Sequence, residues 1–305
     1  MNIIKLISIS ALLTSVFSTC NQPDISQNET TGLYDSDAFK NYWYAGKAEV
    51  NAYNLDQSRY GENRPGKAML IFVTEAFSKS KQVKLDNPEA AGDDKVTVMK
   101  LNYTKNFVTG IYPYSMMLSV FTPVSRNQYP NTLKVTMSSQ EWCGHVFSQM
   151  SLAKNKYEVS SYSYFEQEGD AQFNTDKTLL EDELFSLIRV DPDHIPLGKI
   201  KILPGLFFTR LKHENLKPVE VTLSKVDKDT ETIYKVQFEE RLLTIRVAND
   251  FPHKILGWEE EFVEGGKKMY TKATLDKTLY TDYWNKNKAE YIFLRDSLGL
   301  SSTNY

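Results

Sequence analysis

The densest group of potentially reactive side chains in the sequence is the run Glu141-Trp142-Cys143-Gly144-His145. Cys143 and His145 are two residues apart, so on a β-strand both side chains would lie on one face. They could form a thiolate–imidazole pair or supply two metal ligands, although a metal site at this spacing needs a second pair of ligands. The alternative is a tight turn at Gly144 with Trp142 and Phe147 packed inward, and this is the interpretation that we favour.

Cys143 is one of two cysteines, and the other is Cys20. If Cys20 carries lipid, Cys143 has no partner within the chain, which excludes a disulfide framework. A lone cysteine usually behaves as a small buried apolar residue, and we expect this of Cys143. A reactive thiol is the alternative.

Two further observations concern possible binding residues. His194 lies in Asp191-Pro192-Asp193-His194, which could bind a metal or form a solvated turn. Aromatic residues are abundant, with 18 Tyr, 16 Phe and 4 Trp, and aromatic rings can line a concave sheet or simply pack a β core. The sequence assigns no catalytic residue, no metal ligand and no cofactor. The residues that we predict to contact a ligand are Trp142, Cys143, His145, Tyr162 and Tyr164.

The first twenty residues predict export and a lipid anchor. Lys5 precedes the apolar run 6–17, and small residues then lead to Cys20, which is the order of a secretory signal. The apolar run is shorter than the roughly 20 residues that span a bilayer. We expect cleavage of residues 1–19, lipid on Cys20, a polar flexible tether over 20–36 and a β-rich globular domain over 37–305. An ordinary cleaved signal and an uncleaved anchor are the alternatives.

Charge and motifs narrow the function classes. The net charge of −3 argues against nucleic acid, which requires a clustered basic face. The sequence contains no HExxH, GxSxG, P-loop or GxGxxG motif, and its carboxylates are scattered. The sequence therefore predicts a protein that is not an enzyme.

Short runs rich in β-branched and aromatic residues predict a mainly β fold. The link Glu239-Glu240-Arg241 and the pair Gly265-Gly266 are typical of hairpin turns, so we expect an antiparallel meander that forms a large curved sheet or half-barrel. The predicted strands cover 46–53, 68–74, 95–103, 114–122, 133–137, 156–167, 219–226, 232–238, 242–247, 254–263 and 268–274.

Apolar spacing predicts two helices. One covers Thr178 to Val190, and the other covers Asp276 to Leu298 with Tyr280, Trp284 and Tyr291 on one face. The second would be a C-terminal amphipathic helix packed against the sheet. The segment 36–44 is a weaker candidate.

Three segments resemble a set of uncharacterised lipoproteins from Gram-negative bacteria. They are residues 42–50 (YWYAGKAEV), 141–145 (EWCGH) and 250–258 (DFPHKILGW). Some members carry the label "septum formation inhibitor Maf"; Maf proteins are cytoplasmic nucleotide pyrophosphatases with a Ser-Pro-Arg-Arg-type motif, which this sequence lacks. The strand-rich layout is more loosely similar to the DUF3108 proteins and the LolA/LolB lipoprotein carriers. That similarity implies a curved antiparallel sheet around helices.

Together these observations predict a protein of the cell envelope, lipid-anchored on the periplasmic or outer-membrane face. Its partners would be the membrane and a lipid or another envelope protein. The first hypothesis is a binding protein that holds an apolar ligand, such as a lipid or lipoprotein, in the concave sheet. The second is an interaction or assembly scaffold whose concavity is filled by its own side chains. The third is a hydrolase that uses His145 or His194.

Overall fold

The computed structural model describes residues 33–300, so Cys20 and most of the expected tether lie outside the described residues. Within this range, all the strands belong to one antiparallel-dominated sheet of 15 strands, in the order β8-β7-β6-β5-β4-β3-β2-β1-β15-β14-β13-β12-β11-β10-β9. The strands of the first half are β1 (Ala48–Arg59), β2 (Glu62–Ser78), β3 (Lys95–Thr109), β4 (Tyr112–Pro123), β5 (Lys134–Glu141), β6 (Gly144–Leu152), β7 (Lys156–Ser163) and β8 (Ala171–Asp176). Those of the second half are β9 (Leu179–Leu180), β10 (Gly198–Leu203), β11 (Val219–Asp227), β12 (Glu231–Gln237), β13 (Arg241–Ala248), β14 (Ile255–Glu264) and β15 (Lys267–Thr281).

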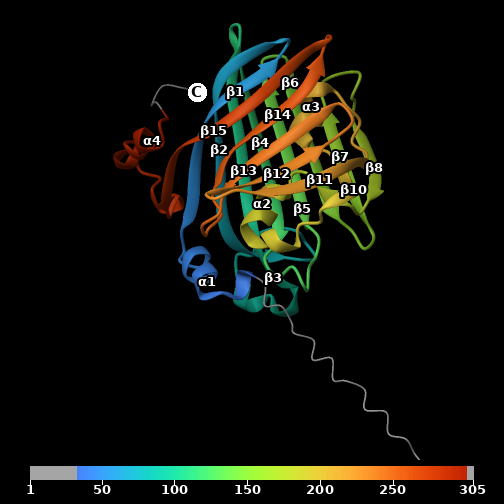
Figure 1. Cartoon of the computed structure of the whole chain (residues 1–305). Coiled ribbons are helices and arrows are strands. Elements are labelled where there is room, and N and C mark those ends of the chain that lie inside the picture. The colour runs from blue at the N-terminus through green and yellow to red at the C-terminus, as the bar shows by residue number, and fades with distance from the viewer. Residues whose placement is uncertain (1–32, 301–305) are drawn as a thin grey trace, which may run out of the picture. The chain divides into compact units, whose positions relative to one another are not determined.

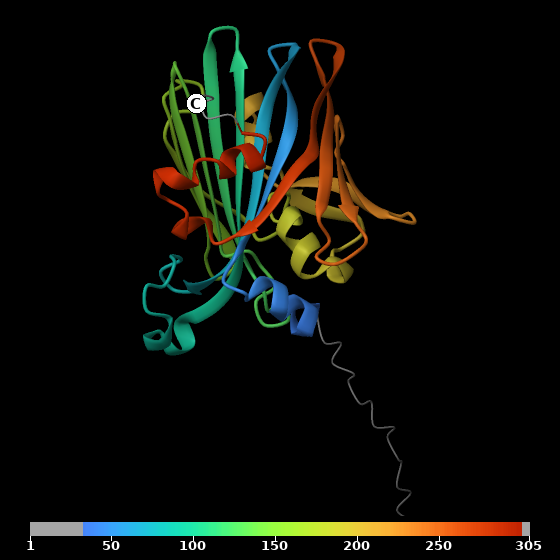
Figure 2. The same cartoon turned by 90° about the vertical axis from the view of Figure 1, so that its left-hand side faces the viewer.

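The sheet is bent back on itself, so that its first half faces its second half (Figures 1 and 2). β1 pairs with β15 in the middle of the strand order, next to the bend. Across the interior, the rings of Tyr103 on β3 and Trp258 on β14 are 5.2 Å apart. The two inner faces therefore share one core, as expected for strands that alternate apolar and polar residues.

The two edges of the sheet are close together along the chain. β8 ends at Asp176 and β9 begins at Leu179, so only residues 177 and 178 connect one edge strand to the other. Two connecting residues span roughly 10 Å at most, which requires the sheet to curl until its edges approach. β8 and β9 are not hydrogen-bonded to each other, so the sheet stays open at this seam.

Two short helices occupy the interior. All seven residues of α2 (Leu184–Val190) are buried, and α3 (Leu206–Lys212) follows β10. The helix predicted from Thr178 is therefore shorter, because Leu179 and Leu180 pair in parallel with β10. The sequence analysis did not predict α3.

The weaker helix candidate is confirmed as α1 (Asp37–Trp43), which Ser36 caps through a 3.1 Å bond from the Phe39 amide. Phe39 and Trp43 on α1 belong to the main core. α1 lies at the end of the sheet opposite the β3–β4 turn (Figure 1).

The predicted C-terminal amphipathic helix over Asp276 to Leu298 is wrong as a continuous helix. β15 continues to Thr281, and Leu279 and Tyr280 pair with Val50 and Glu49 of β1. Beyond it lie the short 3-10 turns 283–285 and 289–291 and the single turn α4 (Leu294–Ser297).

Residues up to Thr281 form a strand instead of a helix because a ladder with β1 satisfies their backbone hydrogen bonds equally well. This pairing depends on β1, which lies next to the segment only in the folded chain. The C-terminal segment instead covers the outer face of the sheet, where Leu298 packs with Val50 and Met69. Trp284 is 42% exposed, so it is not a core residue.

The prediction of a β-dominated fold with a large curved antiparallel sheet is confirmed. The expected hairpin between β12 and β13 and the turn at Gly265-Gly266 are both present. No helix among residues 33–300 is long and apolar enough to cross a membrane.

Candidate functional site

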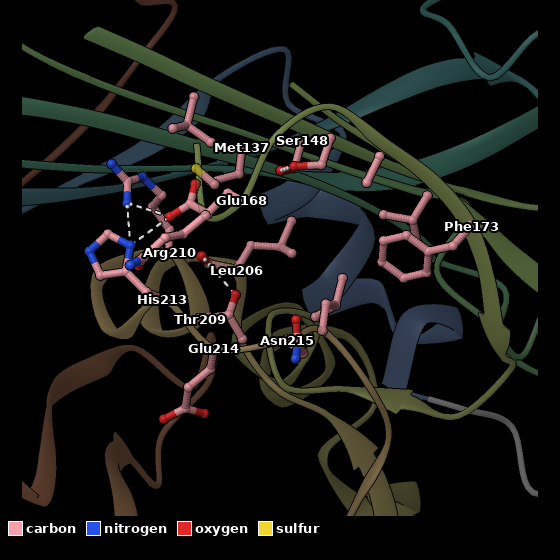
Figure 3. A pocket seen from close by; sticks show the side chains of 16 residues that line it. Met137, Ser148, Glu168, Phe173, Leu206, Thr209, Arg210, His213, Glu214 and Asn215 are labelled. Atoms are coloured by element: carbon pink, nitrogen blue, oxygen red, sulfur yellow. Dashed lines mark hydrogen bonds and ion pairs between the residues drawn. The ribbon is translucent and has the colours of Figure 1, made fainter. Parts of the chain in front are cut away.

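A cavity of about 380 Å³ lies on the inner face of the sheet, next to the open seam, between the strands β5–β8 and α3 (Figure 3). Because alternate residues of a strand share a face, each strand contributes side chains two residues apart. The lining residues are Met137, Val146, Ser148, Val159, Ser161, Gln167, Glu168, Ala171, Phe173, Leu206, Thr209, Arg210, His213, Glu214, Asn215 and Leu216.

The strand register explains the wall of this cavity. Met137, Ser148, Ser161 and Ala171 are direct cross-strand partners and form one row across β5, β6, β7 and β8. The hydroxyls of Ser148 and Ser161 are 2.9 Å apart and hydrogen-bond to each other. Each hydroxyl therefore has one hydrogen-bond partner within the wall, which lowers the cost of placing an apolar group against it.

A charged cluster closes one end of the cavity, and Phe173 lies at the other end (Figure 3). Glu168, in the β7–β8 loop, lies 3.0 Å from Arg210 Nη1 and 2.6 Å from His213 Nδ1. The guanidinium of Arg210 also lies 4.5 Å from the ring centre of Phe165. These contacts hold the end of α3 against the β7–β8 loop and give the cavity one polar end.

The backbone at the end of α3 places His213 in this cluster. His213 adopts a left-handed conformation (φ 56°) directly after the helix, which is a common way for a helix to end. Its position turns the imidazole towards Glu168, with the side chain 39% exposed. Neither His213 nor Arg210 could be identified from the sequence, because neither α3 nor its contact with the β7–β8 loop is visible in a local pattern.

The five residues predicted to contact a ligand do not line this cavity. Tyr162 follows Ser161 and therefore points to the outer face, where it is opposite Phe147. The remaining four lie at the end of the sheet that carries the β5–β6 turn. There the ring of Tyr164 lies over Gly144, so close that a Cβ added to Gly144 would be 2.7 Å from the ring.

The structure corrects the expected packing of this region. The turn between β5 and β6 is present at residues 142 and 143, but Trp142 is 69% exposed and Phe147 is 40% exposed. Phe147 lies on the outer face because its neighbours Val146 and Ser148 point inward. Inward packing of Trp142 and Phe147 was therefore a wrong prediction.

Burial of Cys143 was also a wrong prediction, because its thiol is exposed. The Glu141 carboxylate accepts a 2.6 Å bond from the Cys143 amide and lies beside the thiol. A hydrogen bond to this carboxylate raises the pKa of Cys143, and the nearby negative charge acts in the same direction. The arrangement disfavours the thiolate and so provides the opposite of an activated nucleophile.

The two histidines of the hydrolase hypothesis lie apart from the cavity. His145 is exposed on β6 beside Gln140, with no side-chain hydrogen bond or ion pair to it among residues 33–300. His194 Nδ1 lies 2.6 Å from Asp191, whose hydrogen bond and charge raise the pKa of the imidazole. The His194 side chain is 54% exposed and Asp191 is buried, and neither residue lines the cavity.

No three His, Cys, Asp or Glu side chains in the described part of the chain are grouped so as to hold a metal ion. Comparisons of the chain with protein-family models, with curated proteins and with solved structures find no match. The function of the protein is therefore inferred from the cavity and its chemistry.

Proposed function

We propose that this protein is a lipid-anchored protein of the cell envelope that binds the apolar part of an amphipathic ligand in the cavity beside α3. The observation that carries the proposal is the cavity itself: it is concave, apolar at Met137, Val159 and Phe173, and lined by polar side chains of α3 and the β7–β8 loop, with its charged groups at one end. Its volume of about 380 Å³ is within the range of pockets that bind small molecules. The order of residues 1–20 supports export and attachment through Cys20.

The polarity of the cavity indicates how such a ligand would be oriented. The hydrocarbon part of a ligand would lie along the row from Met137 to Ala171. Its polar head would lie at the charged end of the cavity, against Arg210 and His213. Because Glu168 already lies within hydrogen-bond distance of Arg210 and His213, the cluster presents donors and acceptors together. A head with mixed donors and acceptors fits this end better than a bare anion does.

Binding can be tested with a dansyl-labelled fatty acid as the probe. Ala171→Trp places a large ring inside the cavity and should abolish the rise in dansyl fluorescence. Gln172→Trp is the matched control, because Gln172 is the next residue of β8 and points to the opposite face. Equal binding by both variants, or no binding by the natural protein, would refute the proposal.

The anchor needs a separate test. Cys20→Ser should move the protein from the membrane to the soluble fraction and remove its labelling by palmitate. A variant that stays with the membrane in high salt would contradict the lipid anchor, whatever the outcome of the cavity experiment.

A scaffold without a ligand is the second candidate, and one observation favours it. Much of the interior is occupied by the protein's own side chains, including Tyr103, Phe185 and Trp258, whose rings contact one another at 5.2–5.8 Å. Mass spectrometry of material that co-purifies with the natural protein distinguishes the two candidates, since a scaffold carries no stoichiometric small molecule.

A further inference from the structure

One end of the sheet exposes a large apolar side chain at each of four successive hairpin turns. We call these four residues the apolar rim: Tyr60 between β1 and β2, Ile111 between β3 and β4, Trp142 between β5 and β6, and Tyr164 after β7. They are 55%, 81%, 69% and 71% exposed. In an antiparallel meander every second turn lies at the same end, so the four turns share one end of the sheet (Figure 1).

Contacts along this end connect the four turns. The hydroxyls of Tyr60 and Tyr114 are 2.8 Å apart, and the rings of Tyr112 and Trp142 are 6.3 Å apart. Tyr164 lies over Gly144, directly beyond the Trp142 turn, and its amide donates to the carbonyl of residue 145. These contacts link the turns through residues at the strand ends, whereas the side chains of the apolar rim project separately, each from its own turn.

The turns at the other end of the same strands are polar. Their exposed residues include Lys81, Asn127 and Lys154 in the first half of the sheet and Asp229 in the second. The turns of the second half that share the end of the apolar rim carry Glu239, Glu240 and two glycines. Exposed apolar residues also occur elsewhere, as at Val83 (45% exposed) and Val263 (59%). Among residues 33–300, however, large exposed apolar side chains occupy the turns of four neighbouring hairpins only at this end, which is unlike the scattered exposure of single residues on an ordinary surface.

We propose that the apolar rim inserts into the interface of a lipid bilayer, and that this is a second bilayer surface rather than the one that holds the anchor. Trp and Tyr are the residues that membrane proteins place at the boundary between headgroups and acyl chains, because one part of each ring system is apolar and another forms hydrogen bonds. Separate projecting tips can enter a fluid interface one by one. A protein partner would favour a contiguous packed patch.

The position of the chain's beginning indicates which bilayer is contacted, and this step rests on the proposed anchor at Cys20. The described chain enters at α1, at the end opposite the apolar rim (Figure 2). Residues 33–35 form a 3-10 turn before α1, so only residues 20–32 separate the anchor from the described chain, and 13 residues span about 45 Å at most. The 17-residue strand β2 is itself roughly 55 Å long. A segment of this length does not return along the whole sheet to the rim, whereas a second surface meets the rim without that constraint.

The exposed Cys143 thiol, next to Trp142, provides a probe within the apolar rim. The full-length protein is reconstituted into plain vesicles, Cys143 is labelled with the fluorophore NBD, and phosphatidylcholine vesicles that carry a nitroxide quencher lipid are added. We expect a blue shift and quenching of the label by the added vesicles. The matched control carries the label on Lys154→Cys in a Cys143→Ser background, at the opposite end of β6, and should show neither change.

Two variants test whether the apolar side chains cause the contact. Ile111→Asp should reduce the quenching of the Cys143 label, and Val83→Asp, which changes a 45% exposed residue of the β2–β3 connection, should not. Absence of quenching by added vesicles, or equal quenching of the two label positions, overturns the proposal; the first result would indicate a protein partner for the rim. Failure of the anchor appears separately, as protein that does not remain with the plain vesicles.

Discussion

The two interior helices provide a comparison, because each carries an arginine in its last turn that pairs with a glutamate outside the helix. Arg189 of α2 binds both carboxylate oxygens of Glu49 at 2.7 and 2.8 Å, and both side chains are fully buried. Arg210 of α3 binds Glu168, which is 22% exposed, beside the cavity. The same pair of residue types therefore belongs to a closed core in one place and to an open, potentially functional site in the other.

The difference arises from the surroundings of each pair. Around Arg189 the rings of Trp43 and Phe72 lie 5.1 and 4.6 Å from the guanidinium, and Tyr42 donates a further hydrogen bond to Glu49. Burial alone would raise the pKa of Glu49, but the charge of Arg189 and these hydrogen bonds outweigh it and lower the pKa. Near α3 the ring of Phe165 covers Arg210, which is also buried, but the sheet ends at β8 and Glu168 stays partly exposed.

The largest expected effect is at the buried pair. Arg189→Ala leaves the Glu49 carboxylate buried without its cation, and we expect a loss of about 3–5 kcal/mol in the free energy of unfolding. Denaturation by urea measures it. The double variant Arg189→Met with Glu49→Leu should recover much of the loss, because two apolar side chains need no partner. A double variant as unstable as the single one would show that the pair itself is not the cause.

Trp258 and Phe173 compare the filled and the open interior directly. Trp258→Ala removes a buried ring from the contacts with Tyr53, Tyr103 and Phe185 and should destabilise by about 3–5 kcal/mol. Phe173 is 37% exposed at the cavity, so Phe173→Ala should cost about 1 kcal/mol. Thermal unfolding of both variants tests the comparison, and equal losses would mean that the cavity is packed shut in solution.

Asp182 should make stability depend on pH. Burial, and then the charge of Glu181, raise its pKa to about 8, while Leu206 at the start of α3 donates a 3.0 Å bond to it. Between about pH 4 and pH 8 the unfolded chain has lost this proton and the folded chain keeps it. Asp182 therefore stabilises the fold at low pH, and this contribution falls by up to about 1.4 kcal/mol per pH unit across the window.

Asp182→Asn keeps an acceptor for Leu206 and should flatten this part of the stability curve. The measurement is urea denaturation of both proteins at several pH values between 4 and 8. If the two curves keep the same slope, the carboxyl is ionised in the folded protein and the expected pKa shift is absent.

The smallest effect on stability is expected at the open pair. Glu168→Gln removes the charge beside Arg210 and His213 but keeps a hydrogen-bond acceptor, so the cost should be about 1 kcal/mol or less. The affinity for the dansyl-labelled fatty acid should change by more than the stability does, because the carboxylate lines the cavity. A variant with altered stability and unaltered affinity would place this cluster among the structural contacts.

The β-rich class, most strand positions, the two hairpin turns and a helix over 36–44 could be predicted without the structure. These depend on local chemistry: alternation of apolar residues, glycine pairs at turns, and a Ser36 hydroxyl that accepts from the Phe39 amide. For the same reason, residues 142 and 143 could be recognised as a turn. Their burial could not be recognised, since it depends on which neighbouring strand or loop covers the turn.

The conformation of the C-terminal segment and the composition of the candidate site depend on long-range contacts. Residues 276–281 have helical spacing, yet they pair with β1, more than 200 positions away in the sequence, because a ladder to an existing strand satisfies the backbone equally well. The cavity likewise combines β5–β8 with α3, and Arg210 meets Glu168 across 42 positions. No local pattern encodes such contacts, because they arise when the sheet curls and brings its seam, its loops and its interior helices together.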